Sequence, residues 1–338
     1  MKRLYKPAAV FLVLLMITTV FSVIGATALT FDNYGDYKLV LTEEDTYYLY
    51  SYTGEETHLN LPITVNDKPV LGIYGSCFEN SAIESVVIPD NYITIGDSAF
   101  SNCVNLKSIV IPPIIESIGE FAFYNCTALE SVDMSRATEI EAIPYGAFSG
   151  CKALSEVMIP PNLKKIKEYA FYNTAVESVD FPETVTDLSE GSFSECKVLK
   201  DVKLPTSLKK IGRRAFYNSR SIDEIFIPKS VTSIGEEAFE PMMYSNSISI
   251  NVIKDSAAEE YCQKNNVQNI VSILFGDANN DGKLNISDAT AVQKHVAGIA
   301  AIESLAVKDA ADVSGDGKVT VRDATLIQMR VAGIITSF

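Results

Sequence analysis

Two stretches of twelve residues near the C-terminus, 277–288 and 312–323, carry oxygen-bearing side chains at matching positions. Positions 1, 3, 5 and 12 hold Asp, Asn or Ser, Gly at position 6 permits a sharp turn, and position 7 needs to offer only its backbone carbonyl. A hard cation such as Ca²⁺ takes oxygen ligands in this arrangement, so the sequence predicts two bound Ca²⁺ ions. The expected ligands are Asp277, Asn279, Asp281, Lys283 (backbone) and Asp288, and then Asp312, Ser314, Asp316, Lys318 (backbone) and Asp323.

Both stretches belong to a longer duplication. Aligned from Asp277 and Asp312 over 23 residues, the two copies share 12 identities, including Asp-Ala-Thr and Val-Ala-Gly-Ile. A coincidental acidic turn would have to occur twice at the same offsets. An apolar, Ala-rich segment follows each loop and predicts a helix, whereas no helix is expected before either loop in the manner of a normal EF-hand.

This duplicated loop and helix resembles a type I dockerin over about 64 residues at the C-terminus. The resemblance implies a partner, a cohesin module on a bacterial scaffoldin, as in cellulosomes. The partner-recognition positions of that family fall on Ile286, Ser287, Gln293 and Lys294, and on their counterparts Val321, Arg322, Gln328 and Met329. Neither loop pair is the Ser-Thr common in the best-known members, so the class of cohesin stays open.

The longer region before the loops repeats itself with a period in the twenties. Eight Phe residues lie 22 to 25 residues apart, at 78, 100, 123, 148, 171, 193, 216 and 239. Six of them end an Ile-x-x-x-Ala-Phe motif, and a Leu-x-x-Val-x-Ile-Pro motif follows most of the eight. Such a period is typical of a solenoid, in which each repeat supplies a short strand and a turn, and neighbouring repeats stack. We expect a short helical turn before each Phe, capped by the acidic residue of the motif.

The paired motifs resemble the BspA-like leucine-rich repeats of exported bacterial proteins, over about 190 residues. The expected fold is a solenoid of leucine-rich repeats, with short strands and short helical turns, followed by a small all-α calcium-binding dockerin module. The expected boundaries are 1–28 for a signal peptide, 29–58 for an N-terminal cap, 59–272 for the solenoid with its C-terminal cap, and 273–338 for the dockerin.

One strand position varies while the repeat framework around it does not. It lies between the last two buried strand residues and is expected to point outward, which makes it a candidate ligand surface. The alternative is that an exposed position is simply unconstrained. The residues at this position are Val87, Val110, Asp133, Met158, Asp180, Lys203 and Phe226. A second series at fixed offsets is interpreted as capping and solvation rather than a site: Asp97, Glu120, Glu168, Glu190 and Glu236.

The N-terminus predicts export. Three basic residues precede an apolar run from Ala8 to Ile24, and the small residues Ala26-Thr-Ala28 suit cleavage after Ala28. The alternative is a signal anchor that stays in the membrane. Cleavage would take the formal charge from −15 to −18 by removing those three basic residues. A chain this acidic repels nucleic acid and gains nothing from an anionic membrane surface.

Six Cys residues in an exported chain first suggest disulfides. Four of them, Cys103, Cys126, Cys151 and Cys196, lie three residues after a repeated Phe, where sister repeats have Thr174 and Ser219. Free thiols, packed as small apolar side chains, are therefore expected.

The composition argues against an enzyme. The chain has no Trp and only two His, and neither His falls where it could serve as a general base. Carboxylate pairs suited to glycoside hydrolysis are unavoidable among 43 acidic residues and carry no information. The expected function is a secreted, non-catalytic binding or adhesion module on a scaffoldin, whose repeats bind a protein or glycan. The alternative is a hydrolase or protease-regulating protein in the same complex, which serves polysaccharide degradation.

Overall fold

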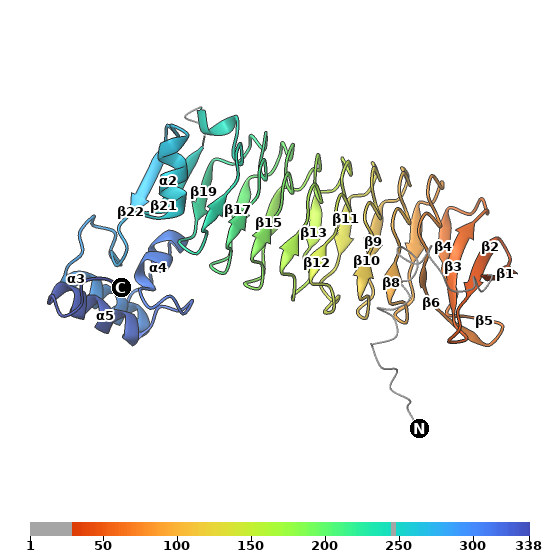
Figure 1. Cartoon of the computed structure of the whole chain (residues 1–338), viewed down its shortest axis with the longest axis horizontal. Coiled ribbons are helices and arrows are strands. Elements are labelled where there is room, and N and C mark those ends of the chain that lie inside the picture. Colours follow the sequence, from red (N-terminus) through yellow and green to blue (C-terminus); the bar gives the residue numbers. More distant parts are fainter. Residues whose placement is uncertain (1–28, 245–247) are drawn as a thin grey trace, which may run out of the picture.

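The computed structural model describes residues 29–244 and 248–338. The predicted signal peptide lies outside the described residues. The described chain forms a long solenoid with a small helical region at its C-terminal end (Figure 1).

An antiparallel meander closes the N-terminal end of the solenoid. It comprises β1 (Thr30–Tyr34), β2 (Tyr37–Leu41) and β3 (Tyr47–Tyr52), of which β3 pairs in parallel with β6 (Lys68–Ile73). A short hairpin joins β5 (Thr64–Val65) to β6. The Tyr- and Thr-rich composition of this region suits strands, whose side chains alternate between core and solvent.

Each coil of the solenoid, meaning one turn of the chain around its axis, contributes a strand to a first parallel row, and the seven central coils also contribute one to a second row. The first row comprises β4 (His58–Asn60), β7 (Ser85–Val87), β9 (Ser108–Val110), β11 (Ser131–Asp133), β13 (Glu156–Met158), β15 (Ser178–Asp180), β17 (Asp201–Lys203), β19 (Glu224–Ile227), β21 (Ser249–Ile253) and β22 (Ile270–Ile273). The second row comprises β8 (Thr94–Ile95), β10 (Ser117–Ile118), β12 (Ala142–Ile143), β14 (Lys165–Ile166), β16 (Asp187–Leu188), β18 (Lys210–Ile211) and β20 (Ser233–Ile234). The expected strand after each Phe is thus confirmed, and a second, two-residue strand precedes the Phe.

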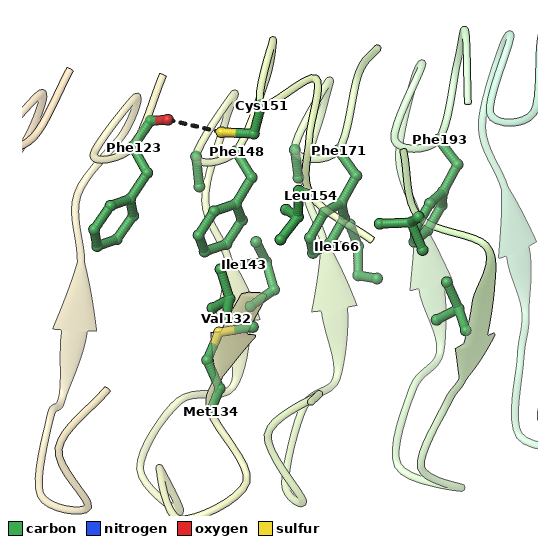
Figure 2. Packing of buried hydrophobic residues seen from close by; sticks show 14 of the residues in the cluster. Phe123, Val132, Met134, Ile143, Phe148, Cys151, Leu154, Ile166, Phe171 and Phe193 are labelled. Carbon is green, nitrogen blue, oxygen red and sulfur yellow. Dashed lines mark hydrogen bonds between the residues drawn. The ribbon is translucent and has the colours of Figure 1, made fainter. Parts of the chain in front are cut away.

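The eight repeated Phe residues form one continuous stack through the core. Neighbouring rings lie 5.0–5.8 Å apart between centroids and within 12° of parallel. Figure 2 shows four of them in a row, at Phe123, Phe148, Phe171 and Phe193. Each ring has a Phe on both sides except at the two ends, where Phe78 meets Tyr52 and Phe239 meets Tyr261. Every coil therefore depends on its neighbours for burial.

The segment before each Phe is a hydrogen-bonded turn, so the expected helical turn is wrong at this point. In every coil the residue two positions before Phe has a left-handed backbone, with φ between 53° and 59°. A left-handed residue interrupts a right-handed helix after a single turn. Asp97 also bonds outside its own turn: its carboxylate accepts a hydrogen bond from the backbone N–H of Glu120, one coil further on, at 2.8 Å.

The six cysteines are free and buried, as expected. Four of them also act as donors: the thiols of Cys103, Cys126, Cys151 and Cys196 donate to a Phe carbonyl of the preceding coil at 3.0–3.1 Å. Figure 2 shows the bond from Cys151 to Phe123. Ser219 makes the same bond with its hydroxyl at 2.8 Å, so the position selects a small donor rather than a small apolar side chain. Burial raises the pKa of the Cys196 thiol to about 11, which keeps the donor protonated.

Four helices follow in the C-terminal region. α2 (Ala257–Lys264) begins at the N-cap Ser256 and lies against the last coils, where a helical C-terminal cap is expected. α3 (Ile286–Val296) and α5 (Val321–Val331) follow the two acidic loops and pack against each other. α4 (Leu305–Ala311) ends where the second loop begins, so the expectation that no helix precedes either loop is wrong for the second loop.

Candidate functional site: two acidic loops and their helices

The first loop is organised by the carboxylates at its two ends. Asp277 accepts hydrogen bonds from the backbone N–H groups of Asp281 at 3.1 Å and Gly282 at 2.7 Å. Asp288 accepts from the backbone N–H groups of Asn279 at 3.3 Å and Asn285 at 2.8 Å. Asp277 is 1% exposed and Asp288 0% exposed, so both charges are withdrawn from water.

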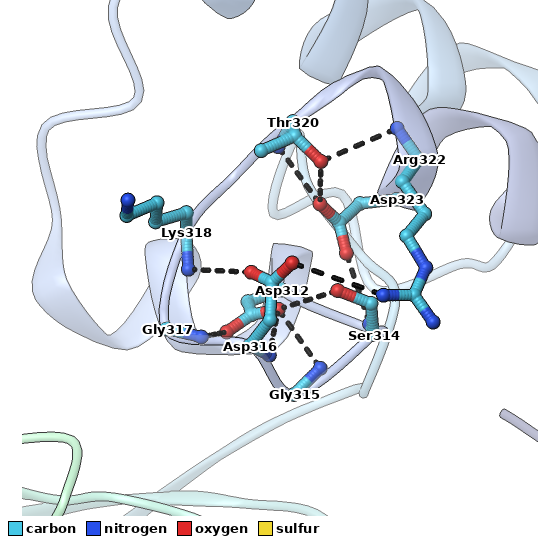
Figure 3. Close-up of polar contacts among 9 residues, drawn as sticks. All are labelled: Asp312, Ser314, Gly315, Asp316, Gly317, Lys318, Thr320, Arg322 and Asp323. Atoms are coloured by element: carbon cyan, nitrogen blue, oxygen red, sulfur yellow. Dashed lines mark hydrogen bonds and ion pairs between the residues drawn. The ribbon is translucent and has the colours of Figure 1, made fainter.

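The second loop repeats this arrangement with its own residues (Figure 3). Asp312 accepts from the backbone N–H groups of Gly315, Asp316 and Gly317 at 2.7–3.2 Å. Asp323, which is 0% exposed, accepts from the backbone N–H groups of Ser314 at 2.9 Å and Thr320 at 2.7 Å.

Each loop leads directly into a helix through a capping box. Asn285 caps α3 and Thr320 caps α5, while Asp288 and Asp323 return a bond to the cap residue's backbone. The acid that closes the loop therefore also starts the helix, at the end where the helix dipole favours negative charge.

The buried carboxylates have little compensating positive charge. In the second loop, Arg322 Nη1 lies 4.0 Å from Asp316 Oδ2, and this ion pair is on the surface. Burial raises the pKa of the Asp288 carboxyl; the backbone N–H bonds oppose this shift, and the charges of Asp277 and Asp281 add to it. Buried carboxylates of this kind are stabilised by a cation.

The oxygen atoms of the two loops are of the kind that binds a hard divalent cation. In the described structure they do not converge on a single position. Among residues 29–244 and 248–338, no three His, Cys, Asp or Glu side chains lie close enough together to hold a metal ion. The end carboxylates point at backbone amides. The remaining expected ligands are Asn279, Asp281 and the Lys283 carbonyl in the first loop, and Ser314, Asp316 and the Lys318 carbonyl in the second. Oxygen-only donors of mixed charge are the chemistry of a calcium loop.

Most of the expected partner-recognition residues lie on the surface of α3 and α5. Ile286, Ser287, Gln293 and Lys294 are exposed, as are Val321 and Arg322, whereas Gln328 and Met329 are half-buried. Two further apolar pairs are exposed that the sequence analysis did not single out: Val296 with Val331, and Ile299 with Ile334. The signal for them was present, because they belong to the Val-Ala-Gly-Ile segment that the two copies share.

The candidate ligand surface on the solenoid is outward-facing over most of its length. Val87 is 60% exposed and Met158 53% exposed, while Val110, Asp180 and Lys203 are also exposed. Strand register places Asp133 between Val110 and Met158, and Asp180 beside Lys203. Asp133 is half-buried and accepts from the backbone N–H of Ser135 at 2.9 Å.

Phe226 is the exception on this surface. It is half-buried and packs against Ile253, Ile273, Ala306 and Ala310, so the helical region covers it. The expectation that Phe226 is free in solvent is wrong, although the alternation of its strand is right: Ile225 and Ile227 on either side are buried.

The two histidines lie on different parts of the chain, His58 on β4 and His295 on α3. His58 Nδ1 lies 2.8 Å from Ser85 Oγ on neighbouring strands β4 and β7, and His58 is exposed. His295 Nδ1 accepts a hydrogen bond from the backbone N–H of Ile302 at 3.1 Å, which stabilises the chain after α3. An exposed His–Ser pair on a flat strand surface lacks the enclosed setting in which such a pair acts as base and nucleophile.

A parallel solenoid followed by a small module with two acidic loops defines a repeat protein with a C-terminal accessory module. The family model of the BspA type leucine rich repeat region matches in six copies, over residues 72–200 and 164–281. These matches cover more than half of the chain, which therefore belongs to the BspA-type leucine-rich-repeat family. The model of the dockerin type I domain matches residues 275–332, so the C-terminal region is a type I dockerin.

Several solved bacterial structures are similar. A leucine rich repeat protein of T. pallidum is 24% identical with a TM-score of 0.51, over 57% of this chain and 91% of that one, which supports the fold. A leucine rich cell surface protein of Faecalibacterium prausnitzii A2-165 is 19% identical with a TM-score of 0.39, over 73% and 96%. A leucine-rich repeat protein of Eubacterium ventriosum ATCC 27560 is 29% identical with a TM-score of 0.37, over 60% and 49%. No curated protein sequence matches the chain.

The family findings carry a coarse function. A type I dockerin implies calcium binding and attachment to a cohesin, as in cellulosomes, and leucine-rich repeats are typically binding modules rather than enzymes. In the described part of the chain, every helix is too short or too polar to cross a membrane.

Proposed function

We propose that this chain is a secreted, non-catalytic binding or adhesion module that its dockerin attaches to a cohesin of a bacterial scaffoldin. The proposed boundaries are cleavage after Ala28, a cap over 29–58, a solenoid over 59–272 and a dockerin over 273–338. The leucine-rich repeats bind a protein or glycan outside the cell.

The observation that carries the proposal is that the dockerin surface consists of two matching halves, one from each copy of the duplication. Three apolar residues are exposed in each copy, and each lies 35 residues from its counterpart: Ile286 and Val321, Val296 and Val331, Ile299 and Ile334. These side chains recur at the same places on each helix and just after its end. Exposed apolar side chains of this kind are typical anchors for a protein partner. The residues beside them differ between the copies, Ser287 and Lys294 in one and Arg322 and Met329 in the other, and these differences set which cohesin is accepted.

The loops hold this surface in place. When bound, two Ca²⁺ ions would supply the positive charge that the loop carboxylates lack. The ligands we propose are Asp277, Asn279, Asp281, Asp288 and the Lys283 carbonyl, with Asp312, Ser314, Asp316, Asp323 and the Lys318 carbonyl. Asp288 and Asp323 transmit the effect, because each is both a loop carboxylate and a capping residue of the helix that carries the exposed apolar residues.

The test is capture of residues 29–338 by immobilised type I cohesins, with calcium and with a chelator. We expect capture in calcium and loss of capture in chelator. The double change Asp277→Asn with Asp312→Asn should lose capture in calcium as well, whereas Glu303→Gln, an exposed acid between the loops, should not. Capture that is equal with calcium and chelator would contradict the proposal.

A further inference from the structure

The short helix α4 has two buried faces rather than one. Val307 and Ala311 lie in the core of the dockerin, beside residues of α3 and α5. Ala306 and Ala310 lie in a separate apolar cluster that belongs to the end of the solenoid. Residues four apart share one side of a helix, so one side of α4 faces the dockerin and the other faces the solenoid.

The solenoid supplies the other half of that second cluster. Ile253 at the end of β21 and Ile273 at the end of β22 are 0% and 5% exposed, and Phe226 of β19 packs against them. These are the last strands of the first row, where the stack of coils stops. A solenoid needs a cap at each end, because the last coil has no neighbour to cover its apolar side.

Polar contacts fix α4 in this position. The backbone N–H of Lys229, after β19, donates to Asp309 Oδ2 of α4 at 2.9 Å. The Lys229 ammonium lies 3.1 Å from the centre of the Phe275 ring, a cation–π contact with the start of the dockerin. The backbone N–H of Gly276 donates to the carbonyl of Ala310 at 2.8 Å, which joins the first residues of the dockerin to α4.

Both acidic loops begin at this contact. Asp277 follows Phe275 by two residues, and Phe275 packs against both the dockerin core and the second cluster. Asp312 follows Ala310 by two residues and is the C-cap residue of α4. A cation that orders either loop therefore also restrains a residue that touches the solenoid.

We propose that the dockerin is the closing cap of the solenoid, docked through α4, and that calcium in its loops strengthens this closure. The inference rests on the proposed calcium binding. In this arrangement α4 lies between the solenoid and the rest of the dockerin (Figure 1). The exposed residues of α3 and α5 remain free for cohesin. The repeats are then held at a fixed orientation to the scaffoldin instead of on a flexible tether.

The experiment is hydrogen–deuterium exchange on residues 29–338, with calcium and with chelator. Calcium should slow exchange in the loops and, several-fold, in peptides that cover β19, β21 and β22, while peptides from β7 to β13 stay unchanged. Ala306→Glu, which adds a charge at a residue 3% exposed, should abolish the response of β19, β21 and β22. Leu305→Glu adds the same charge at the neighbouring residue, which is 47% exposed, and should leave the response intact.

If Ala306→Glu unfolds the dockerin, exchange in the loops will no longer respond to calcium. A second variant is then needed. Lys229→Ala lies outside the dockerin and removes the cation–π contact, so it should weaken the response of β19, β21 and β22 while the loops still respond. If calcium slows the loops of the unaltered chain but not these strands, the closure is overturned and the attachment to cohesin stands. If the loops do not respond either, the proposed calcium binding fails and the closure fails with it.

Discussion

In the solenoid each coil buries a Phe between the Phe residues of its neighbours, whereas the dockerin buries Asp277, Asp288 and Asp323 beside a small apolar core. The first region gains stability from apolar burial repeated along an axis. The second withdraws negative charge from water and needs a cation to offset that cost. Stability in one region is therefore a matter of side-chain volume, and in the other a matter of charge.

Removal of one ring from the Phe stack should be the most damaging change to the solenoid. Phe171 is 1% exposed and stacks on Phe148 at 5.4 Å and Phe193 at 5.2 Å. We expect Phe171→Ala to cost about 3–5 kcal/mol in the free energy of unfolding. Urea unfolding of residues 29–338 in calcium measures it, with Tyr172→Ala, at a 36% exposed neighbour, as the control that should cost far less. Equal costs would mean that the stack is not the source of solenoid stability.

Removal of calcium should act on the other region. A ligand present at a hundred times its dissociation constant stabilises the state that binds it by about 2.7 kcal/mol. Chelation should therefore lower the thermal midpoint of the dockerin and move the main solenoid transition much less. Calorimetry of residues 29–338 with calcium, with magnesium and with chelator separates the two transitions. A dockerin midpoint that does not move would place its stability in the apolar core alone.

Near the contact between the two regions, two residues at the same repeat position differ in burial. Phe226 and Met158 occupy the same repeat position, but the dockerin covers Phe226 and leaves Met158 53% exposed. Phe226→Ser should cost about 1–2 kcal/mol, since part of a large apolar side chain is removed from a contact. Met158→Ser should stay within about 0.5 kcal/mol. Chemical denaturation of both variants decides the matter, and equal costs would mean that the dockerin does not rest on Phe226.

The thiol position should respond to loss of a donor rather than loss of volume. Cys126→Ala removes the bond to the Phe100 carbonyl and should cost about 1 kcal/mol beyond the cost of Cys126→Ser, which keeps a donor as Ser219 does. Urea midpoints of the two variants test this, and a less stable Ser variant would restore the purely apolar interpretation.

Much of this comparison could be predicted from the sequence, because both regions repeat. The Phe period predicted the coils and the buried position of each Phe, and the matched loops predicted the helices that follow them. The contact of α4 with Phe226 could not be predicted, since its two sides lie about 80 residues apart and neither carries a periodic signal. The left-handed turn was missed because residues as different as Ser98, Phe121 and Gly146 occupy it, so composition gives no hint.

The central claim is that the duplicated loop and helix units form the surface that a cohesin recognises. Affinity for an immobilised type I cohesin, in calcium, tests it most directly with three variants: Ile286→Ala with Ser287→Ala, Val321→Ala with Arg322→Ala, and all four changes together. If the two copies give two usable faces, each pair alone should keep binding close to that of the unaltered chain, and the four changes together should abolish it. Loss of binding with either pair alone would show that only one orientation is used. Full binding after all four changes would contradict the claim.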